Sequence, residues 1–213
     1  MSRVSEAFAH AAAEQRAALI PYITAGDGGR ERTLTVMKAL ADSGADLIEL
    51  GVPFSDPMAD GPVIQAACQR ALAIGTTLED VFEIVAEFRR TDARTPVVLM
   101  GYMNPLERYG LGRAAERAAA VGADAFLVVD CPPEEAGALD DALRDNNLDH
   151  ICLVAPTSTD KRLQMIAERA SGFVYLVGLK GVTGAAHLDH ETLAEPIRQM
   201  RRHTGLPIAV GFG

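Results

Sequence analysis

Two acidic residues lie where a short apolar run gives way to a loop rich in proline and glycine, in the segment IELGVPFSDPMADGP (48–62). Glu49 lies within the apolar run, and Asp60 lies on the loop directly before Gly61 and Pro62. Apolar neighbours disfavour the charged form of a carboxyl group, so a Glu49 side chain among them would have a raised pKa. A carboxyl group with a pKa near neutrality can both donate and accept a proton. The segment therefore predicts acid–base chemistry, with Glu49 as the first candidate.

Each of these acidic residues also has a structural interpretation. Glu49 could form an ion pair with a lysine or arginine, or it could face the solvent. Asp60 could form an Asx turn or cap a helix over IQAACQRALA (64–73), which is common for an aspartate before Gly-Pro. Asp56 lies in a Ser-Asp-Pro sequence that is typical of a turn. The residues alone leave both interpretations of Glu49 open and favour capping for Asp60.

The elements that must position these residues are short apolar runs that alternate with helical patterns. The runs are ALIPYITA (18–25), DLIELG (46–51), PVVLMG (96–101), AFLVVD (125–130), HICLVA (150–155), GFVYLVG (172–178) and LPIAVGFG (206–213). Each run is continuously apolar, which is typical of parallel strands buried on both faces. A Gly-Ala-Asp sequence links helix to strand at both 44–46 and 122–124. These repeated units predict a (β/α)8 barrel or a doubly wound sheet, and the lack of a GxGxxG motif after the first run disfavours a dinucleotide-binding fold.

Polar residues that follow the predicted strands are further candidates for an active site, because the loops of a parallel barrel gather at the carboxyl ends of its strands. The loop after the third run carries Tyr102 and Asn104. The loop at 178–187 contains three glycines, so it could close as a lid or offer backbone N–H groups to an anion. No metal site is predicted, because His187 and His190 have no third ligand nearby in the sequence.

The composition limits the class of protein. The chain has 213 residues, of which 48% are hydrophobic, and a formal net charge of −9 with acidic and basic residues interspersed. This argues against a nucleic-acid-binding protein, whose charge would be basic and clustered. No apolar run approaches the roughly 20 residues of a membrane span. Three cysteines without a CxxC pair indicate a reducing compartment, so we expect a cytoplasmic protein. No low-complexity linker or shift in composition divides the sequence, so we expect a single domain over residues 1–213.

Six segments spread over essentially the whole chain are distinctive in sequence. They are LIPYITAGD, IELGVPFSDPMADGPVIQ, LMGYMNPLERYG, LVAPTSTDKR, GFVYLVGLKGVTGA and LPIAVGFG. Their order and spacing resemble the successive motifs of the tryptophan synthase alpha subunit family, and the second segment is the most specific. The resemblance implies a (β/α)8 barrel that cleaves indole-3-glycerol phosphate to indole and glyceraldehyde 3-phosphate. It also implies that the chain needs no metal and no cofactor of its own.

The resemblance assigns the family's two acidic catalytic residues to Glu49 and Asp60. It implies that Glu49 moves the protons of the cleavage, while Asp60 stays ionised and accepts the N–H group of the indole ring. The substrate-binding residues that it implies are Tyr22, Met100, Leu127 and Phe212 around the ring, Tyr175 near Glu49, and Thr183, Gly184 and Gly213 toward the phosphate. It also implies that Asp56 and Asn104 face a beta subunit, a pyridoxal-phosphate enzyme that receives indole within an α2β2 heterotetramer.

The chain departs from the family pattern in two places. The lid has the sequence GLKG (178–181), where many relatives have a serine and then an arginine. The family continues beyond the seventh strand, so the eighth strand and the helix that follows it are missing from this sequence. We therefore expect a trimmed or incomplete form of a longer barrel protein, and a truly truncated barrel should be weakly active, poorly soluble or dependent on a partner.

Three alternatives to a biosynthetic lyase remain open at this point. A truncated barrel could bind and regulate the beta subunit while being catalytically silent. The chain could also be a stand-alone lyase that supplies indole to secondary metabolism. A different phosphate-binding barrel, such as a sugar-phosphate isomerase, is the third.

Overall fold

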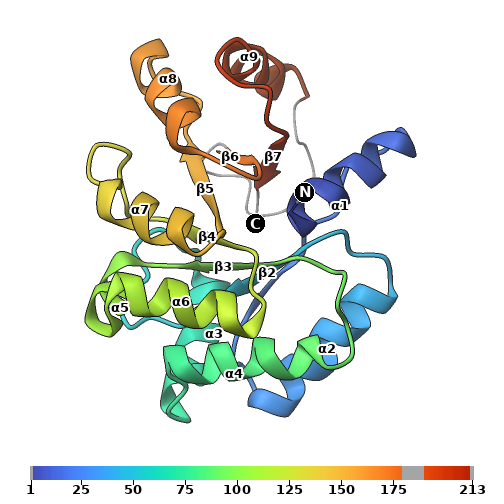
Figure 1. Ribbon diagram of the computed structural model, residues 1–213, viewed down its shortest axis with the longest axis vertical. Helices are drawn as coiled ribbons and strands as arrows, with labels where there is room; N and C mark the ends of the chain where they lie inside the picture. Colours follow the sequence, from blue (N-terminus) through green and yellow to red (C-terminus); the bar gives the residue numbers. More distant parts are fainter. Residues whose placement is uncertain (1, 179–189, 212–213) are drawn as a thin grey trace.

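The computed structural model describes residues 2–178 and 190–211, which form a curled sheet surrounded by helices (Figure 1). The strands are β1 (Tyr22–Thr24), β2 (Ile48–Gly51), β3 (Val97–Gly101), β4 (Ala125–Val128), β5 (Asp149–Val154), β6 (Val174–Val177) and β7 (Ile208–Gly211). Every neighbouring pair is parallel, and the order of the strands in the sheet is their order in the chain. The described part of the chain thus has the seven strands that the sequence predicts, arranged as in a (β/α)8 barrel.

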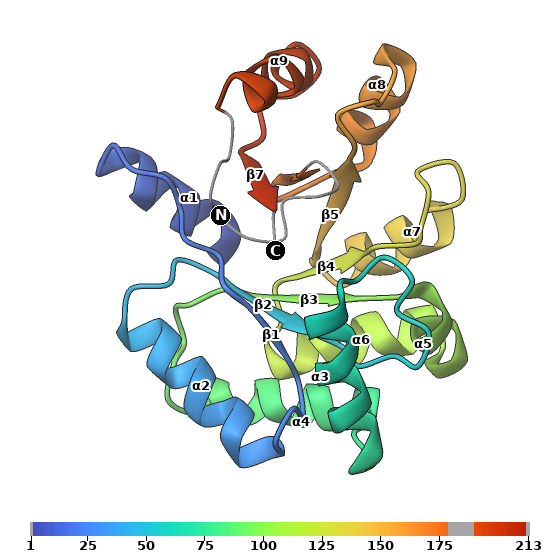
Figure 2. The same cartoon turned by 180° about the vertical axis from the view of Figure 1, so that it is seen from behind.

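Helices cover the outer face of the curled sheet (Figure 2). They are α2 (Arg30–Asp42), α3 (Pro62–Ala73), α4 (Leu78–Arg89), α5 (Met103–Tyr109), α6 (Leu111–Val121), α7 (Gly137–Asp145), α8 (Asp160–Arg169) and α9 (His190–Arg201). The N-terminal helix α1 (Arg3–Ala13) packs instead against side chains inside the curled sheet. The sequence predicts a loop after β3, whereas α5 begins at Met103. Pro105 does not prevent this, because it lies in the first turn, where its missing N–H group has no helical partner. No described helix is long and apolar enough to cross a membrane.

Side chains of the strands alternate between the interior of the curled sheet and the surrounding helices. The buried members of the interior cluster are Val4, Leu47, Val98, Ala125, Leu127, Ile151 and Phe173. Helix α1 contributes to this cluster, and the ring of its Phe8 lies 5.3 Å from that of Phe173. Ile48 and Leu50 belong instead to the outer cluster beneath the helices. The alternation along β2 therefore directs Glu49 toward the interior.

The repeated Gly-Ala-Asp sequence forms the same structure twice. Gly44 and Gly122 have φ angles of +93° and +85°, which is the left-handed conformation that glycine favours at the end of a helix. The aspartate two residues later then precedes a strand. In the first copy, Asp46 accepts hydrogen bonds from the guanidinium group of Arg16 and from the backbone N–H of Leu19. The aspartate of the repeat thus binds neighbouring segments at the start of a strand.

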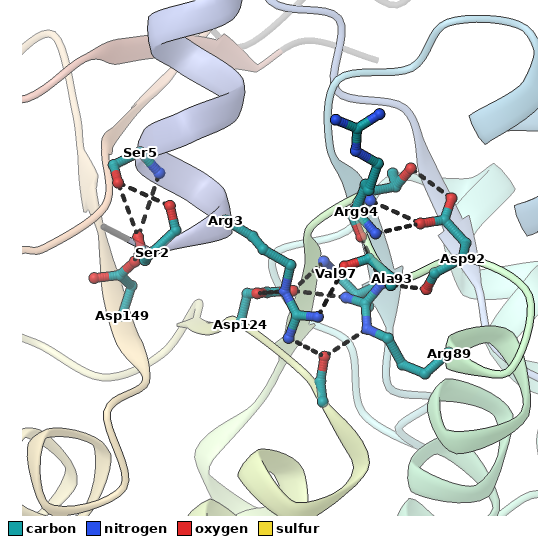
Figure 3. Close-up of polar contacts among 12 residues, drawn as sticks. Ser2, Arg3, Ser5, Arg89, Asp92, Ala93, Arg94, Val97, Asp124 and Asp149 are labelled. Carbon is teal, nitrogen blue, oxygen red and sulfur yellow. Dashed lines mark hydrogen bonds and ion pairs between the residues drawn. The ribbon is translucent and has the colours of Figure 1, made fainter.

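The second copy of the repeat forms a buried cluster around Asp124 (Figure 3). Arg3 Nε donates to Asp124 Oδ1 at 2.7 Å, and a terminal nitrogen of Arg89 donates to Oδ2 at 2.8 Å. The backbone N–H of Val97 also donates to Oδ2 at 2.8 Å. Asp124 therefore links the N-terminal helix, the end of α4 and the start of β3.

Candidate active site

Glu49 is a buried carboxyl group, and the described part of the chain offers it no hydrogen-bond or ion-pair partner. Its exposed fraction is 3%, and its Oε1 atom has no hydrogen-bond partner among the residues that the structure describes. Burial raises the pKa of Glu49 to about 7, because removal from water penalises the charged form. Glu49 is therefore not a solvent-facing residue, and within residues 2–178 and 190–211 it forms no ion pair. Its position suits the acid–base interpretation.

Asp60 is held on the loop between β2 and α3. Its backbone N–H donates to the carbonyl of Pro57 at 3.1 Å, and its own carbonyl accepts a hydrogen bond from Gln65 Nε2 at 2.8 Å. Its carboxylate accepts a hydrogen bond from the hydroxyl group of Tyr102 at 2.9 Å. The N-cap of α3 is Gly61, without any side-chain hydrogen bond, so the capping interpretation of Asp60 is wrong. The carboxylate is thus directed toward the end of β3 and does not bind the helix terminus.

The two carboxyl groups have different electrostatic environments. Burial alone raises the pKa of Glu49. Burial also raises the pKa of Asp60, but the hydrogen bond from Tyr102 opposes this effect by favouring the ionised form. Pairs of carboxyl groups whose environments differ in this way can divide the acid and base roles of one reaction.

Two tyrosines lie near both carboxyl groups. Burial raises the pKa of Tyr22 and of Tyr175, and the negative charges of Glu49 and Asp60 raise each of them further. Tyr22 is the direct neighbour of Glu49 in the pairing of β1 with β2, and Tyr175 packs against the interior cluster. Side chains from β1, β2, β6 and the loop after β2 therefore converge on one region inside the curled sheet.

Two glycines make room for these tyrosine rings. A Cβ atom at Gly51, on β2, would overlap the hydroxyl group of Tyr22 on the neighbouring strand. A Cβ atom at Gly211, on β7, would overlap the hydroxyl group of Tyr175 on β6 in the same way. Each ring therefore lies across the strand beside its own, a close approach that glycine permits.

The remaining predicted site residues fall into three groups. Met100 on β3 packs against the interior cluster, and Leu127 on β4 is part of it. Asp56 and Asn104 are exposed, on the loop after β2 and at the start of α5. Four predicted substrate-binding residues lie outside the described residues, namely Thr183, Gly184, Phe212 and Gly213.

The sequence analysis missed the contact between Tyr102 and Asp60. It placed Tyr102 at the end of a strand, but it did not connect this residue with a carboxyl group 42 positions earlier. The parallel pairing of β2 with β3 could have indicated this contact, since loops that follow neighbouring parallel strands meet at the same end of a barrel.

The described residues contain no group of three or more His, Cys, Asp or Glu side chains that could hold a metal ion. His187 lies outside this part of the chain. Cys68, Cys131 and Cys152 are free, and Cys68 and Cys152 are buried, as expected for structural cysteines.

A curled parallel sheet with two carboxyl groups of different environment near its interior has the architecture of a barrel enzyme that works by acid–base chemistry. The model of a family described as "Tryptophan synthase alpha chain" matches residues 8–213. Curated alpha chains from Nitrosococcus oceani and Alkalilimnicola ehrlichii are 54% and 55% identical to this chain. The matches cover 100% of this chain and 79% and 78% of those relatives.

Solved structures agree with the sequence comparisons. The crystal structure of tryptophan synthase subunit alpha from Legionella pneumophila matches with a TM-score of 0.92 and 43% identity, covering 100% of this chain and 79% of that one. A chain of the tryptophan synthase α2β2 complex from Pyrococcus furiosus matches with a TM-score of 0.85 and 44% identity, covering 92% and 78%. The chain belongs to the tryptophan synthase alpha chain family. The predicted family and barrel fold are thereby confirmed.

Proposed function

We propose that this chain cleaves indole-3-glycerol phosphate to indole and glyceraldehyde 3-phosphate, with Glu49 and Asp60 as its catalytic residues. The observation that carries the assignment is the buried Oε1 atom of Glu49, which has no partner among the described residues. A buried polar atom that lacks a hydrogen bond costs about 1–3 kcal/mol, so the lack of a partner among the described residues supports a functional role for this carboxyl group.

Glu49 supplies the proton transfers of this retro-aldol cleavage. The bond between C3 of the indole ring and the glycerol chain breaks when C3 gains a proton and the adjacent hydroxyl group loses one. The hydroxyl oxygen then becomes the aldehyde oxygen of the second product. A carboxyl group with a pKa of about 7 can give and take protons near neutral pH, and Glu49 has this property.

Asp60 supplies the complementary negative charge. Protonation of C3 leaves positive charge on the indole nitrogen, so an ionised carboxylate that accepts the N–H group stabilises this intermediate. The hydrogen bond from Tyr102 favours the ionised form of Asp60. These steps consist of proton transfers and charge stabilisation, and we infer that the chain's own side chains supply them.

The interior positions of four residues support their assignment to the indole ring. Met100 and Leu127 provide apolar surface, and Tyr22 and Tyr175 provide aromatic rings next to the two carboxyl groups. Apolar and aromatic walls with a few polar groups are typical of sites that bind small molecules.

A variant of Glu49 tests the proposed reaction. Glu49→Gln should reduce indole release from indole-3-glycerol phosphate by about 100-fold or more, the scale of general acid–base catalysis. Glu116→Gln on the exposed side of α6 is the matched control and should retain the wild-type rate. A near-normal rate for Glu49→Gln would remove Glu49 from the mechanism.

The same assay separates the lyase from a silent regulatory subunit. Indole release is measured with the chain alone and with a tryptophan synthase beta subunit, and the beta reaction is followed in parallel. Release of indole supports the lyase. Stimulation of the beta reaction without any release would instead show a subunit that only regulates its partner.

We infer that the partner of this chain is a beta subunit, as in the Pyrococcus furiosus α2β2 complex. Asp56 is exposed on the loop after β2 and Asn104 is exposed at the start of α5, which follows β3, so both are accessible to a partner that covers this end of the barrel. Asp56→Ala should leave cleavage by the isolated chain largely intact and weaken stimulation by the beta subunit. Asp141→Ala on α7 is the matched control, since its side chain is exposed on another element.

A further inference from the structure

We propose that Tyr102 is a positioning residue for Asp60 in the cleavage reaction. This proposal rests on the function proposed above. Its hydroxyl group fixes the orientation of the Asp60 carboxylate, so that one carboxylate oxygen is engaged by the protein and the other is left for the substrate.

The hydroxyl group of Tyr102 joins two points of one loop. It donates a hydrogen bond to Asp60 Oδ2 at 2.9 Å and accepts one from the backbone N–H of Ala59 at 3.0 Å. The donor role toward the carboxylate is fixed, because the Ala59 N–H can only donate. No described residue donates a hydrogen bond to Asp60 Oδ1. The arrangement therefore distinguishes the two oxygens of the same carboxylate.

The ring that carries this hydroxyl group is itself anchored. Tyr102 is 4% exposed, follows β3 directly, and its ring centroid lies 5.2 Å from that of Phe54. The next residue, Met103, donates its backbone N–H to Asp130 Oδ1 at 2.7 Å. A side chain held by neighbouring elements restricts the conformations of a carboxylate on a loop, which is what precise positioning of a catalytic group requires.

The charged surroundings of Asp60 determine how the loss of this hydrogen bond would be observed. The titratable groups that influence Asp60 or respond to its charge are Tyr22 on β1, Cys68 on α3, Tyr102 after β3 and Tyr175 on β6. Glu49 on β2 acts on the same Tyr22 and Tyr175. Among them, only Tyr102 forms a hydrogen bond with the Asp60 carboxylate in the described part of the chain. Removing this donor destabilises the ionised form, so the pKa of Asp60 should rise.

Tyr102→Phe is the decisive variant, because it removes the hydroxyl group and retains the ring that packs on Phe54. In the complex with a beta subunit, kcat for indole release should fall by about tenfold with little change in KM, as expected for the loss of one hydrogen bond to a charged group. The acid limb of the pH profile should move to higher pH by about one unit. Tyr109→Phe is the matched control: it removes a tyrosine–carboxylate hydrogen bond to Glu79 outside the site and should change none of these quantities.

A double-mutant cycle distinguishes positioning from a direct catalytic or purely structural role. Tyr102→Phe should have no further effect on kcat in an Asp60→Asn background, because the hydroxyl group acts through the carboxylate. Fully multiplicative losses, or an unchanged acid limb in Tyr102→Phe, would overturn the proposal.

A measurement without substrate separates this proposal from the proposed reaction. The carboxyl carbon of Asp60 is titrated by NMR in ¹³C-aspartate-labelled wild type and Tyr102→Phe. A rise in the Asp60 pKa in the variant supports the positioning role, even if the wild type releases no indole. The absence of indole release would refute only the proposed reaction. Equal pKa values in the two proteins would refute the positioning role whatever the activity.

Discussion

Asp124 and Glu49 are two carboxyl groups that are buried to similar extents in the same sheet, with exposed fractions of 8% and 3%. Asp124 precedes β4 and accepts hydrogen bonds from Arg3, Arg89 and the backbone of Val97. Glu49 lies within β2, and its Oε1 atom has no partner among the described residues. Burial alone therefore does not distinguish the two carboxyl groups. They differ in whether their oxygens have hydrogen-bond partners among the described residues, and this difference supports the catalytic role proposed for Glu49.

The two positions also differ in their place along the strands. In a parallel barrel, the amino-terminal ends of the strands serve stability and the carboxyl ends serve catalysis. Asp124 joins three elements at the amino-terminal end, whereas Glu49 lies inside the curled sheet near Tyr22 and Tyr175, and Asp60 lies on the loop after β2. The comparison predicts that substitution of Asp124 changes stability, and that substitution of Glu49 mainly changes activity.

The largest expected effect is the loss of stability in Asp124→Ala. This change leaves the guanidinium group of Arg89, whose side chain is 11% exposed, without its carboxylate. Breaking a buried ion pair by removing one partner costs about 3–5 kcal/mol. Urea unfolding should show this decrease, whereas Asp141→Ala, which removes an exposed ion pair with Arg144, should change stability by less than about 1 kcal/mol. Equal effects of the two variants would contradict the structural role of Asp124.

In contrast to Asp124→Ala, Glu49→Gln should increase the stability of the folded protein, and the size of the increase should depend on pH. The pKa of Glu49 is about 7 in the folded protein and 4.5 for the unperturbed group, so the folded state binds its proton more tightly than the unfolded state does. The stability that Glu49 contributes is thus present below pH 4.5 and is lost as the pH rises through 7. Glutamine does not titrate, so the stability of the variant relative to wild type should increase by about 2 kcal/mol between pH 5 and pH 8. A difference in unfolding free energy between the variant and the wild type that stays constant over this pH range would contradict the raised pKa of Glu49.

Gly51→Ala should damage the catalytic region without affecting the Asp124 cluster. The added methyl group would displace the ring of Tyr22, which lies beside Glu49. We expect kcat/KM for cleavage to fall by about tenfold, which corresponds to about 1.4 kcal/mol. Gly61→Ala is the matched control, because a Cβ atom there meets nothing within 4 Å. A wild-type rate in Gly51→Ala would show that the position of Tyr22 is not important for the reaction.

The smallest expected effect is that of Arg3→Ala. The Arg3 side chain is 32% exposed, and Asp124 keeps Arg89 and Val97 as donors when Arg3 is removed. The variant should lose about 1 kcal/mol of stability and retain the pH profile of cleavage. An altered pH profile would show that the two ends of the barrel are coupled.

The sequence was sufficient to predict the family and the seven parallel strands, and it expected Glu49 at the end of the second strand, whereas β2 continues to Gly51. Continuous apolar runs identify buried strands because both faces of such a sheet are covered. The same analysis could not decide whether Glu49 had a partner, since partners such as the arginines of Asp124 come from positions 121 and 35 residues away. Pairings of this kind become visible only in three dimensions.

Asp60 illustrates a second limit. Its position before Gly-Pro favours a capping role, and the local pattern contains no sign of the tyrosine that binds it. The helix is capped by Gly61, and the Asp60 side chain pairs with Tyr102 because β2 and β3 are neighbours in the sheet. Local propensity was correct about the loop and wrong about the side chain, because a contact with a residue distant in the sequence overrides it.

The agreement between strand order and chain order has a consequence for biosynthesis. Each strand that leaves the ribosome finds its partner already synthesised, so the sheet can grow from its amino-terminal edge while translation continues. The pairing that brings Tyr22 beside Glu49 can form early, whereas Tyr175 joins only after β6 has been made. A nascent chain can thus pair Tyr22 with Glu49 before the strands that complete their surroundings have been made.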